Sequence, residues 1–245
     1  MKNIKLINYL VEHDVVVTNK LFPREKLYTN DKVINQIKLI DGIHKILMKY
    51  YGDGISRING SIGKAIEDIK VDVKRGREHI DLLQDKKNLD CMEIFLLEHG
   101  NEILINCNEV LSLLDKVDYL SLYRRSMKKK EICLGKVDES NLRAVENLEI
   151  GSINGIKYNL VEEDIISYLR IVKKNNKSID IKNIIKEYVT NTYLNCNSKK
   201  YIEALLIYPY ETMKYWHKFR KNKKGKSSKE YLDKISEAYM NEIIL

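Results

Sequence analysis

The scarcity of helix-breaking residues is the feature that most constrains the fold of this chain. Its 245 residues include only two prolines and 11 glycines. A β-sandwich or barrel needs turn residues at intervals of about 8–12 positions, so this sequence argues against both. Hydrophobic residues make up 44% of the chain, which is enough to build a core. We therefore expect a mainly α-helical protein.

The N-terminal half is predicted to start with an arm and to continue as helices. Residues 1–28 contain a β-branched run, Val15–Thr18, followed by Pro23, and are expected to form an extended arm or a residual strand. From residue 29 to 130 apolar residues recur at helical spacing. Gly52 is expected to end the first helix, and Gly100 to kink or break the third.

The periodicity changes at residue 131. Short apolar runs separated by Asn, Gly and Asp fill residues 131–160, a pattern typical of small strands and turns. Residues 161–245 return to helical spacing, and Pro209 suits the first turn of a helix. With no internal repeat or linker in view, residues 29–245 are predicted to form a single domain.

The charge and the cysteines point to no particular site. The net charge is +8, but lysine is abundant along the whole chain, and a diffuse excess needs no polyanionic partner. Four cysteines lack metal-ligand spacing and are expected to be reduced and mostly buried. The five histidines share no motif and are interpreted as helix-face or surface residues. Acidic residues 162–164 at a predicted helix start complement its dipole.

One basic stretch mixes cations with aromatic residues and is the candidate site for an anion or a partner. Tyr215, Trp216 and Phe219 are expected to form the buried face of a helix, with the lysines in solvent; binding of nucleic acid is the alternative. A second basic run at residues 124–130 adds little to that alternative. The candidate residues are Lys214, Lys218, Arg220, Lys221, Lys223 and Lys224.

The second half of the chain resembles a known family in the order and spacing of its motifs. In CotS-type spore-coat proteins, relatives of aminoglycoside and choline phosphotransferases with a kinase-like fold, a strand leads into a loop of the form H-G-D-x-x-x-x-N. Here residues 131–133 lead into Leu134-Gly135-Lys136 and end at Asn141. Residues 163–169 and 208–216 resemble two structural helices of that family, which makes Asp164 and Pro209 structural residues.

The resemblance also shows which catalytic groups are replaced. Lys136 stands where the family has the aspartate that orients the hydroxyl group, and an ammonium group is no base for that step. Residues 150–154 stand where an aspartate holds magnesium, and they contain no carboxylate. Leu134, Gly135, Lys136 and Asn141 therefore form a degenerate catalytic loop, and the resemblance predicts no catalytic residue, no metal, no cofactor and no enzyme.

The resemblance further implies a scaffold without a complete N-terminal lobe. Residues 1–28 are too few for the sheet of roughly a hundred residues that carries the ATP-binding lysine. The surface around Gly135–Asn141 and Gly151–Gly155 is expected to bind other coat proteins or a second copy. The expected location is the mother-cell cytoplasm and then the spore coat, with no membrane span, and nucleic acid is kept only as an alternative partner.

Three functions remain open from the sequence. The first is a non-catalytic, pseudokinase-like structural protein of the spore coat. The second is a divergent small-molecule phosphotransferase that uses Asp138 or Glu139 as its base. The third is a basic protein that binds nucleic acid or another anionic surface through residues 214–229.

Overall fold

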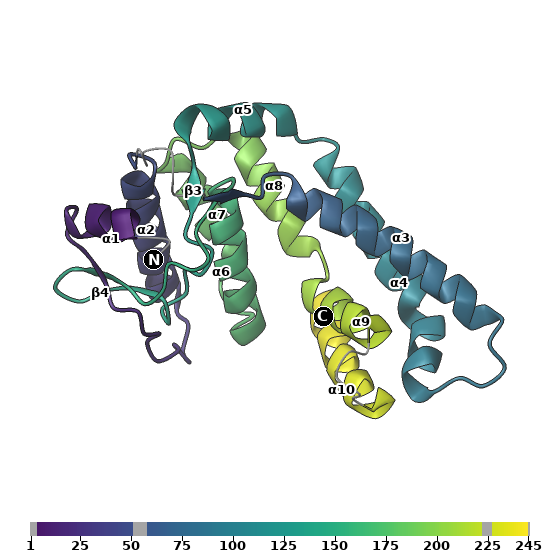
Figure 1. The fold of residues 1–245 in the computed structure, drawn as a ribbon. Coiled ribbons are helices and arrows are strands. Elements are labelled where there is room, and N and C mark those ends of the chain that lie inside the picture. The colour runs from purple at the N-terminus through teal and green to yellow at the C-terminus, as the bar shows by residue number, and fades with distance from the viewer. Residues whose placement is uncertain (1–3, 51–57, 222–226, 245) are drawn as a thin grey trace. The chain divides into compact units, whose positions relative to one another are not determined.

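A computed structural model describes residues 4–50, 58–221 and 227–244, and it is mostly helical, as the sequence predicts (Figure 1). The chain divides into two compact units, each built from two separate stretches of sequence. Unit 1 holds residues 1–62 and 118–203, and unit 2 holds residues 63–117 and 204–245. Helix α8 (Cys196–Ile207) begins in unit 1 and ends in unit 2.

Unit 1 combines helices with two small sheets. Its helices are α1 (Ile4–Val11), α2 (Asn30–Leu47), α5 (Tyr119–Lys129), α6 (Glu162–Asn175) and α7 (Ile181–Thr190), together with the start of α8. Its strands are β1 (Val15–Val17), β2 (Asn59–Gly60), β3 (Ile132–Cys133), β4 (Leu142–Ala144), β5 (Leu148–Ile150) and β6 (Lys157–Tyr158).

Each sheet of unit 1 has three strands and joins distant parts of the chain. In the first sheet β5 is central, with β1 parallel to it in the register Val15↔Leu148 and β4 antiparallel to it. In the second sheet β6 lies between β2 and β3. The β-branched residues of β1 thus pair with a segment more than a hundred positions away, which fixes the N-terminal part of the chain to the middle.

Helix α2 shows how the apolar pattern becomes packing. Thr29 caps its N-terminus by accepting a hydrogen bond from the Lys32 N–H. Val33, Ile37 and Ile40 are buried along one face, and α2 packs against α6. The helix ends at Leu47, and the proposed end at Gly52 lies outside the described residues.

Unit 2 is helical throughout its described residues. It contains α3 (Lys64–Gln84), α4 (Cys91–Leu114), α9 (Tyr210–Lys221), α10 (Ser228–Tyr239) and a short π-helix (Met240–Ile244). Helices α3 and α4 lie side by side as a hairpin (Figure 1). Asp90 and Glu93 form a capping box at the start of α4, and the Pro209 carbonyl accepts from the Met213 N–H at the start of α9.

Gly100 does not break α4, which was one of the two outcomes predicted for it. The helix runs unbroken from Cys91 to Leu114. A Cβ atom at Gly100 would lie 2.9 Å from the Ile80 side chain and 3.3 Å from that of Trp216, and Gly76 on α3 is equally crowded. Glycine is needed here because α3, α4 and the indole of Trp216 approach closely.

Three short elements were not anticipated. Strand β2 lies within residues 29–130, where helices and no strand were predicted. Helix α1 precedes β1 in the segment that was expected to be an arm or a strand. Strand β4 directly follows the loop that ends at Asn141 and forms a hairpin with β5. The mainly helical class and the small β element in the middle of the chain are as predicted.

Candidate functional site

The loop from Leu134 to Asn141 begins at a fixed position because a buried carboxylate holds its backbone. Asp164, in the first turn of α6, accepts the Leu134 N–H at 2.8 Å and the Gly135 N–H at 2.9 Å. Gly135 has φ +84, and a Cβ atom there would lie 2.4 Å from the Gly155 carbonyl oxygen. Only glycine fits such a conformation and contact, so the start of the loop has one geometry.

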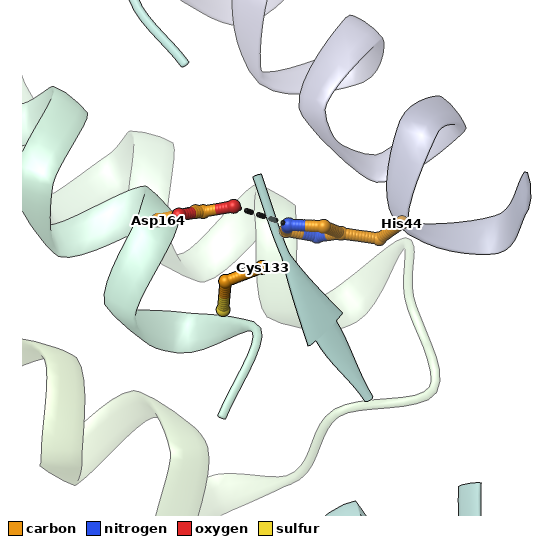
Figure 2. Close-up of side chains that lie close together, drawn as sticks. All are labelled: His44, Cys133 and Asp164. Carbon is orange, nitrogen blue, oxygen red and sulfur yellow. Dashed lines mark hydrogen bonds and ion pairs between the residues drawn. The ribbon is translucent and has the colours of Figure 1, made fainter. Parts of the chain in front are cut away.

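His44 of α2 and Cys133 of β3 join Asp164 in a buried cluster, drawn in Figure 2. The His44 Nε2 atom lies 2.9 Å from Asp164 Oδ2. The Cys133 thiol donates to the Leu160 carbonyl at 3.0 Å. One ligand atom from each residue lies within 4.8 Å of the others, which is close enough for the three residues to hold a metal ion.

The donor atoms of this cluster are engaged in ways that do not suit a metal ion. Full burial, with the charge of Asp164, raises the pKa of the Cys133 thiol well above its ordinary value, so the sulfur keeps its proton. Both Asp164 oxygens accept backbone N–H groups, and we assign the proton of the short contact to His44 Nε2. The three residues form a hydrogen-bonded anchor for the loop.

Glu139 is the acid in the loop whose environment is most unusual. Its Oε1 atom accepts from the Tyr168 hydroxyl at 2.7 Å, whereas its Oε2 atom is buried and has no hydrogen-bond partner among the described residues. Burial raises the pKa of Glu139, and the charges of Asp138 and Glu25 act in the same direction. Burial and the charge of Glu139 raise the pKa of Tyr28 to about 12.

Asp138 is instead used to turn the loop. Its Oδ1 atom accepts from the Ser140 N–H at 3.0 Å and from the Ser140 hydroxyl, and its carbonyl accepts from the N–H groups of Asn141 and Leu142. A carboxylate held this way stabilises the turn. Of the two acids that the sequence offers as a base, Glu139 is the one with a buried oxygen that has no hydrogen-bond partner among the described residues.

Asn141 ties the loop to the segment after β5. Its Nδ2 group donates to the Lys136 carbonyl at 2.7 Å and to the Ser152 carbonyl at 3.0 Å. The backbone carbonyl of Asn141 accepts a hydrogen bond from the Gly151 N–H. Asn141 is fully buried, yet its Oδ1 atom has no partner among the described residues. An orphaned oxygen of this kind is a suitable ligand for a hard cation.

The other residues of the predicted degenerate loop differ in exposure. Leu134 is fully buried, and its N–H group is one of those held by Asp164. The Lys136 side chain is half-exposed, and its backbone is held by Asn141. The loop therefore presents one cation and one unusual acid on a rigid backbone.

A second buried cluster escaped the sequence analysis, which grouped Arg125 with a basic run. The Arg125 guanidinium donates to Glu131 at 2.8 Å, to Glu162 at 2.7 Å and 2.8 Å, and to the Ser198 hydroxyl. Burial alone would lower the pKa of Arg125, but the bonds to the two carboxylates raise it above its ordinary value. Glu162 thus serves a buried ion pair as well as the helix dipole.

The basic stretch of unit 2 does not act as one group. Lys214 pairs with Glu211 at 2.6 Å, and Lys218 and Lys221 are exposed. Arg220 is half-buried, 3.3 Å from a nitrogen of His217. Lys223 and Lys224 lie outside the described residues.

Trp216, in the same helix, is buried as predicted. Its exposed fraction is 2%, and its indole N–H donates to His79 at 3.0 Å. The helix therefore uses this aromatic residue for packing. Anion binding by the neighbouring cations stays a prediction.

The cysteines are less buried than expected. Cys107 and Cys133 are buried, whereas Cys91 and Cys196 are exposed, and all four are free thiols. Both exposed residues lie at helix N-termini, where side chains point outward more readily than the apolar spacing suggested.

Comparison with known proteins adds one finding. Neither a protein-family model nor a curated protein matches the sequence. Among solved structures, an aminoglycoside phosphotransferase from Alicyclobacillus acidocaldarius subsp. acidocaldarius is similar, with a TM-score of 0.68 at 14% sequence identity. The fold is aminoglycoside phosphotransferase-like. The match covers 90% of this chain and 64% of that enzyme, so the chain spans less than two thirds of it.

This similarity corrects the expectation that the chain is no enzyme, because the matching structure is that of a phosphotransferase. The expectation rested on the two replaced carboxylates, and Asp138 and Glu139, just beyond Lys136, were assigned only to the alternative of a divergent phosphotransferase. The predicted lack of a complete N-terminal lobe stays a prediction. No helix within the described residues is long and apolar enough to cross a membrane.

Sequence reasoning identified some site residues and missed others. Asp164 was expected to be structural, and it does hold the loop. His44 was interpreted as a helix-face residue because its partner lies 120 positions away. The spacing of the apolar residues in α2 was the signal that the sequence offered, because position 44 falls on the face that this spacing marks as buried.

Proposed function

We propose that this chain is a divergent small-molecule phosphotransferase in which Glu139 is the acid–base residue. The similarity in fold to an aminoglycoside phosphotransferase supports the reaction class. The observation that carries the proposal is the second oxygen of Glu139, which is buried and lacks a hydrogen-bond partner among the residues described. A carboxylate with a raised pKa and a free oxygen is suited to take a proton.

In the proposed reaction, Glu139 takes the proton of an acceptor hydroxyl group. The hydroxyl oxygen then bonds to the terminal phosphorus of ATP, the bond to the bridging oxygen breaks, and ADP leaves. Asn141 Oδ1 is the described atom best suited to hold a magnesium ion, which would neutralise phosphate charge when bound with the nucleotide. The Lys136 ammonium adds positive charge in the same loop.

Nucleotide binding is the first test. Titration with Mg-ATP should raise the melting temperature, because a ligand that binds only the folded state stabilises it. ATP consumption is then measured with a panel of aminoglycosides, amino alcohols and sugars as acceptors. A melting temperature that does not change at millimolar Mg-ATP would refute the proposal.

Glu139→Gln tests the assigned base. This variant keeps the size of the side chain and should bind Mg-ATP as before, while phosphoryl transfer falls by about 10²–10⁴-fold. The matched control is Glu146→Gln, an exposed residue of the β4–β5 turn, which should change neither property. Equal rates in both variants would show that Glu139 is not the base.

A role in the spore coat is a second proposal and concerns location. It is supported by the order of the motifs around Gly135, Asn141 and Asp164 that resembles CotS-type proteins. Fractionation of spores with an antibody against this chain tests it. Recovery in the coat extract is expected, and recovery only from vegetative cells would refute it.

A further inference from the structure

Helix α5 has one face buried in unit 1. Leu122 is fully buried and Ser126 almost so, and they lie four positions apart on the inner side. Arg125 is held in its cluster with two glutamates. Lys129 lies over the ring of Tyr193, 4.2 Å from the centroid. These contacts fix which side of the helix faces outward.

The exposed surface next to this buried side carries large apolar residues where solvent-facing polar residues are usual. Leu120, Tyr123 and Met127 follow one another at spacings of three and four, which places them on one stripe. Their exposed fractions are 53%, 41% and 56%. Single exposed apolar residues are common, but three on one stripe of an 11-residue helix form a patch.

Two cations lie along one edge of this stripe. Arg124 and Lys128 are exposed and lie one turn apart, and no hydrogen bond, ion pair or ring contact is formed by either within the described part of the chain. Their neighbours Arg125 and Lys129 are both engaged. We call Leu120, Tyr123, Arg124, Met127 and Lys128 together the α5 outer face.

We propose that the α5 outer face binds an acidic amphipathic helix of a partner protein. Aromatic residues, methionine and arginine are the residue types enriched at protein interfaces, and this face holds all three. Its apolar stripe suits the apolar side of a helix laid along it. The two unpaired cations select a partner whose flanking residues are Asp or Glu.

The same features disfavour two other occupants. In a symmetric dimer the face would meet its own copy, which would bring the cations of both chains together. Nucleic acid is bound mainly through phosphate contacts, and this face offers only two unpaired cations beside three large apolar side chains. The docking face is independent of the proposed phosphotransferase activity.

The test uses a designed peptide as the probe, about 18 residues or five turns long. Leucines at helical spacing form one side, and glutamates fill the rest; fluorescence anisotropy measures its binding to the full chain. A peptide with lysines in place of the glutamates is the charge control. We expect the acidic peptide to bind at least about tenfold more tightly, with an affinity that falls as salt rises.

Two pairs of variants locate the site. The double variant Leu120→Ser with Met127→Ser should weaken peptide binding at least about tenfold. The control is the double variant Leu82→Ser with Ile105→Ser, at exposed apolar positions of unit 2, which should leave peptide binding unchanged. Arg124→Glu with Lys128→Glu should remove the preference for the acidic peptide. The same change of charge at Lys182 and Lys186, exposed and one turn apart on α7, should leave it intact.

Three results would overturn the proposal. The first is no binding of the acidic peptide, or equal binding by all variants. The second is dimerisation in sedimentation that Met127→Ser abolishes, which would assign the face to a second copy. The third is retention of DNA that Arg124→Glu with Lys128→Glu removes and the serine variants do not, which would assign it to nucleic acid.

Discussion

Replacing Asp164 by Asn separates two explanations for the acidic start of α6. If the carboxylate only complements the helix dipole, its loss costs about 0.3–1 kcal/mol. In the structure it also accepts from Leu134, Gly135 and His44. An Asn side chain keeps one oxygen and places an NH₂ group against at least one of these donors. With about 1.5–3 kcal/mol for a bond to a charged group, we expect Asp164→Asn to cost about 2–4 kcal/mol.

The assay is urea unfolding followed by far-UV circular dichroism, with the m-value required to stay constant. Asp31→Asn is the matched control, since Asp31 is exposed in the first turn of α2 and its side chain forms no hydrogen bond or ion pair with another described residue. Trp216, the single tryptophan of the chain, lies in unit 2 and reports whether that unit is affected. Costs for the two variants that agree within about 0.5 kcal/mol would refute the anchor role of Asp164.

Three further predictions follow from buried groups. Arg125→Met leaves two buried carboxylates without a cation and should cost about 3–5 kcal/mol, as urea unfolding at neutral pH will show. Gly100→Ala should cost about 1–3 kcal/mol through its clash in unit 2, whereas Gly42→Ala, with open space around it in α2, should raise the melting temperature. Burial raises the pKa of Glu139, so protonation of this residue favours folding in acid, and that stabilisation is lost as the pH rises. Glu139→Gln should therefore raise the melting temperature at neutral pH, where the charged side chain is removed. Below the ordinary pKa of glutamate the same variant should leave the melting temperature unchanged.

The helices were predictable because their signal is local. Apolar residues at spacings of three and four mark α2 to α4 in the sequence, and most of these residues are buried in the structure. Helix α1 was missed because its eight residues adjoin a β-branched run that dominated the interpretation. Strand β4 is three residues long and exists only through pairing with β5, so it has no pattern of its own.

The site was less predictable because its contacts join distant positions. The motif order identified the loop and Asp164, but the partner of Asp164 on α2 is 120 residues away. Arg125 looks like one cation in a basic run until the fold brings Glu162 to it from 37 positions along the chain. Local charge patterns cannot distinguish a buried ion pair from a solvated face.

The division of unit 2 between two stretches of sequence has a consequence during synthesis. The α3–α4 hairpin is complete at residue 114, but the indole that fills the space beside Gly76 and Gly100 comes from residue 216. About a hundred residues must still be translated before that ring arrives, which takes on the order of 5–20 s at the usual rates of protein synthesis. Throughout this interval the nascent hairpin carries an apolar surface that the Trp216 ring does not yet cover.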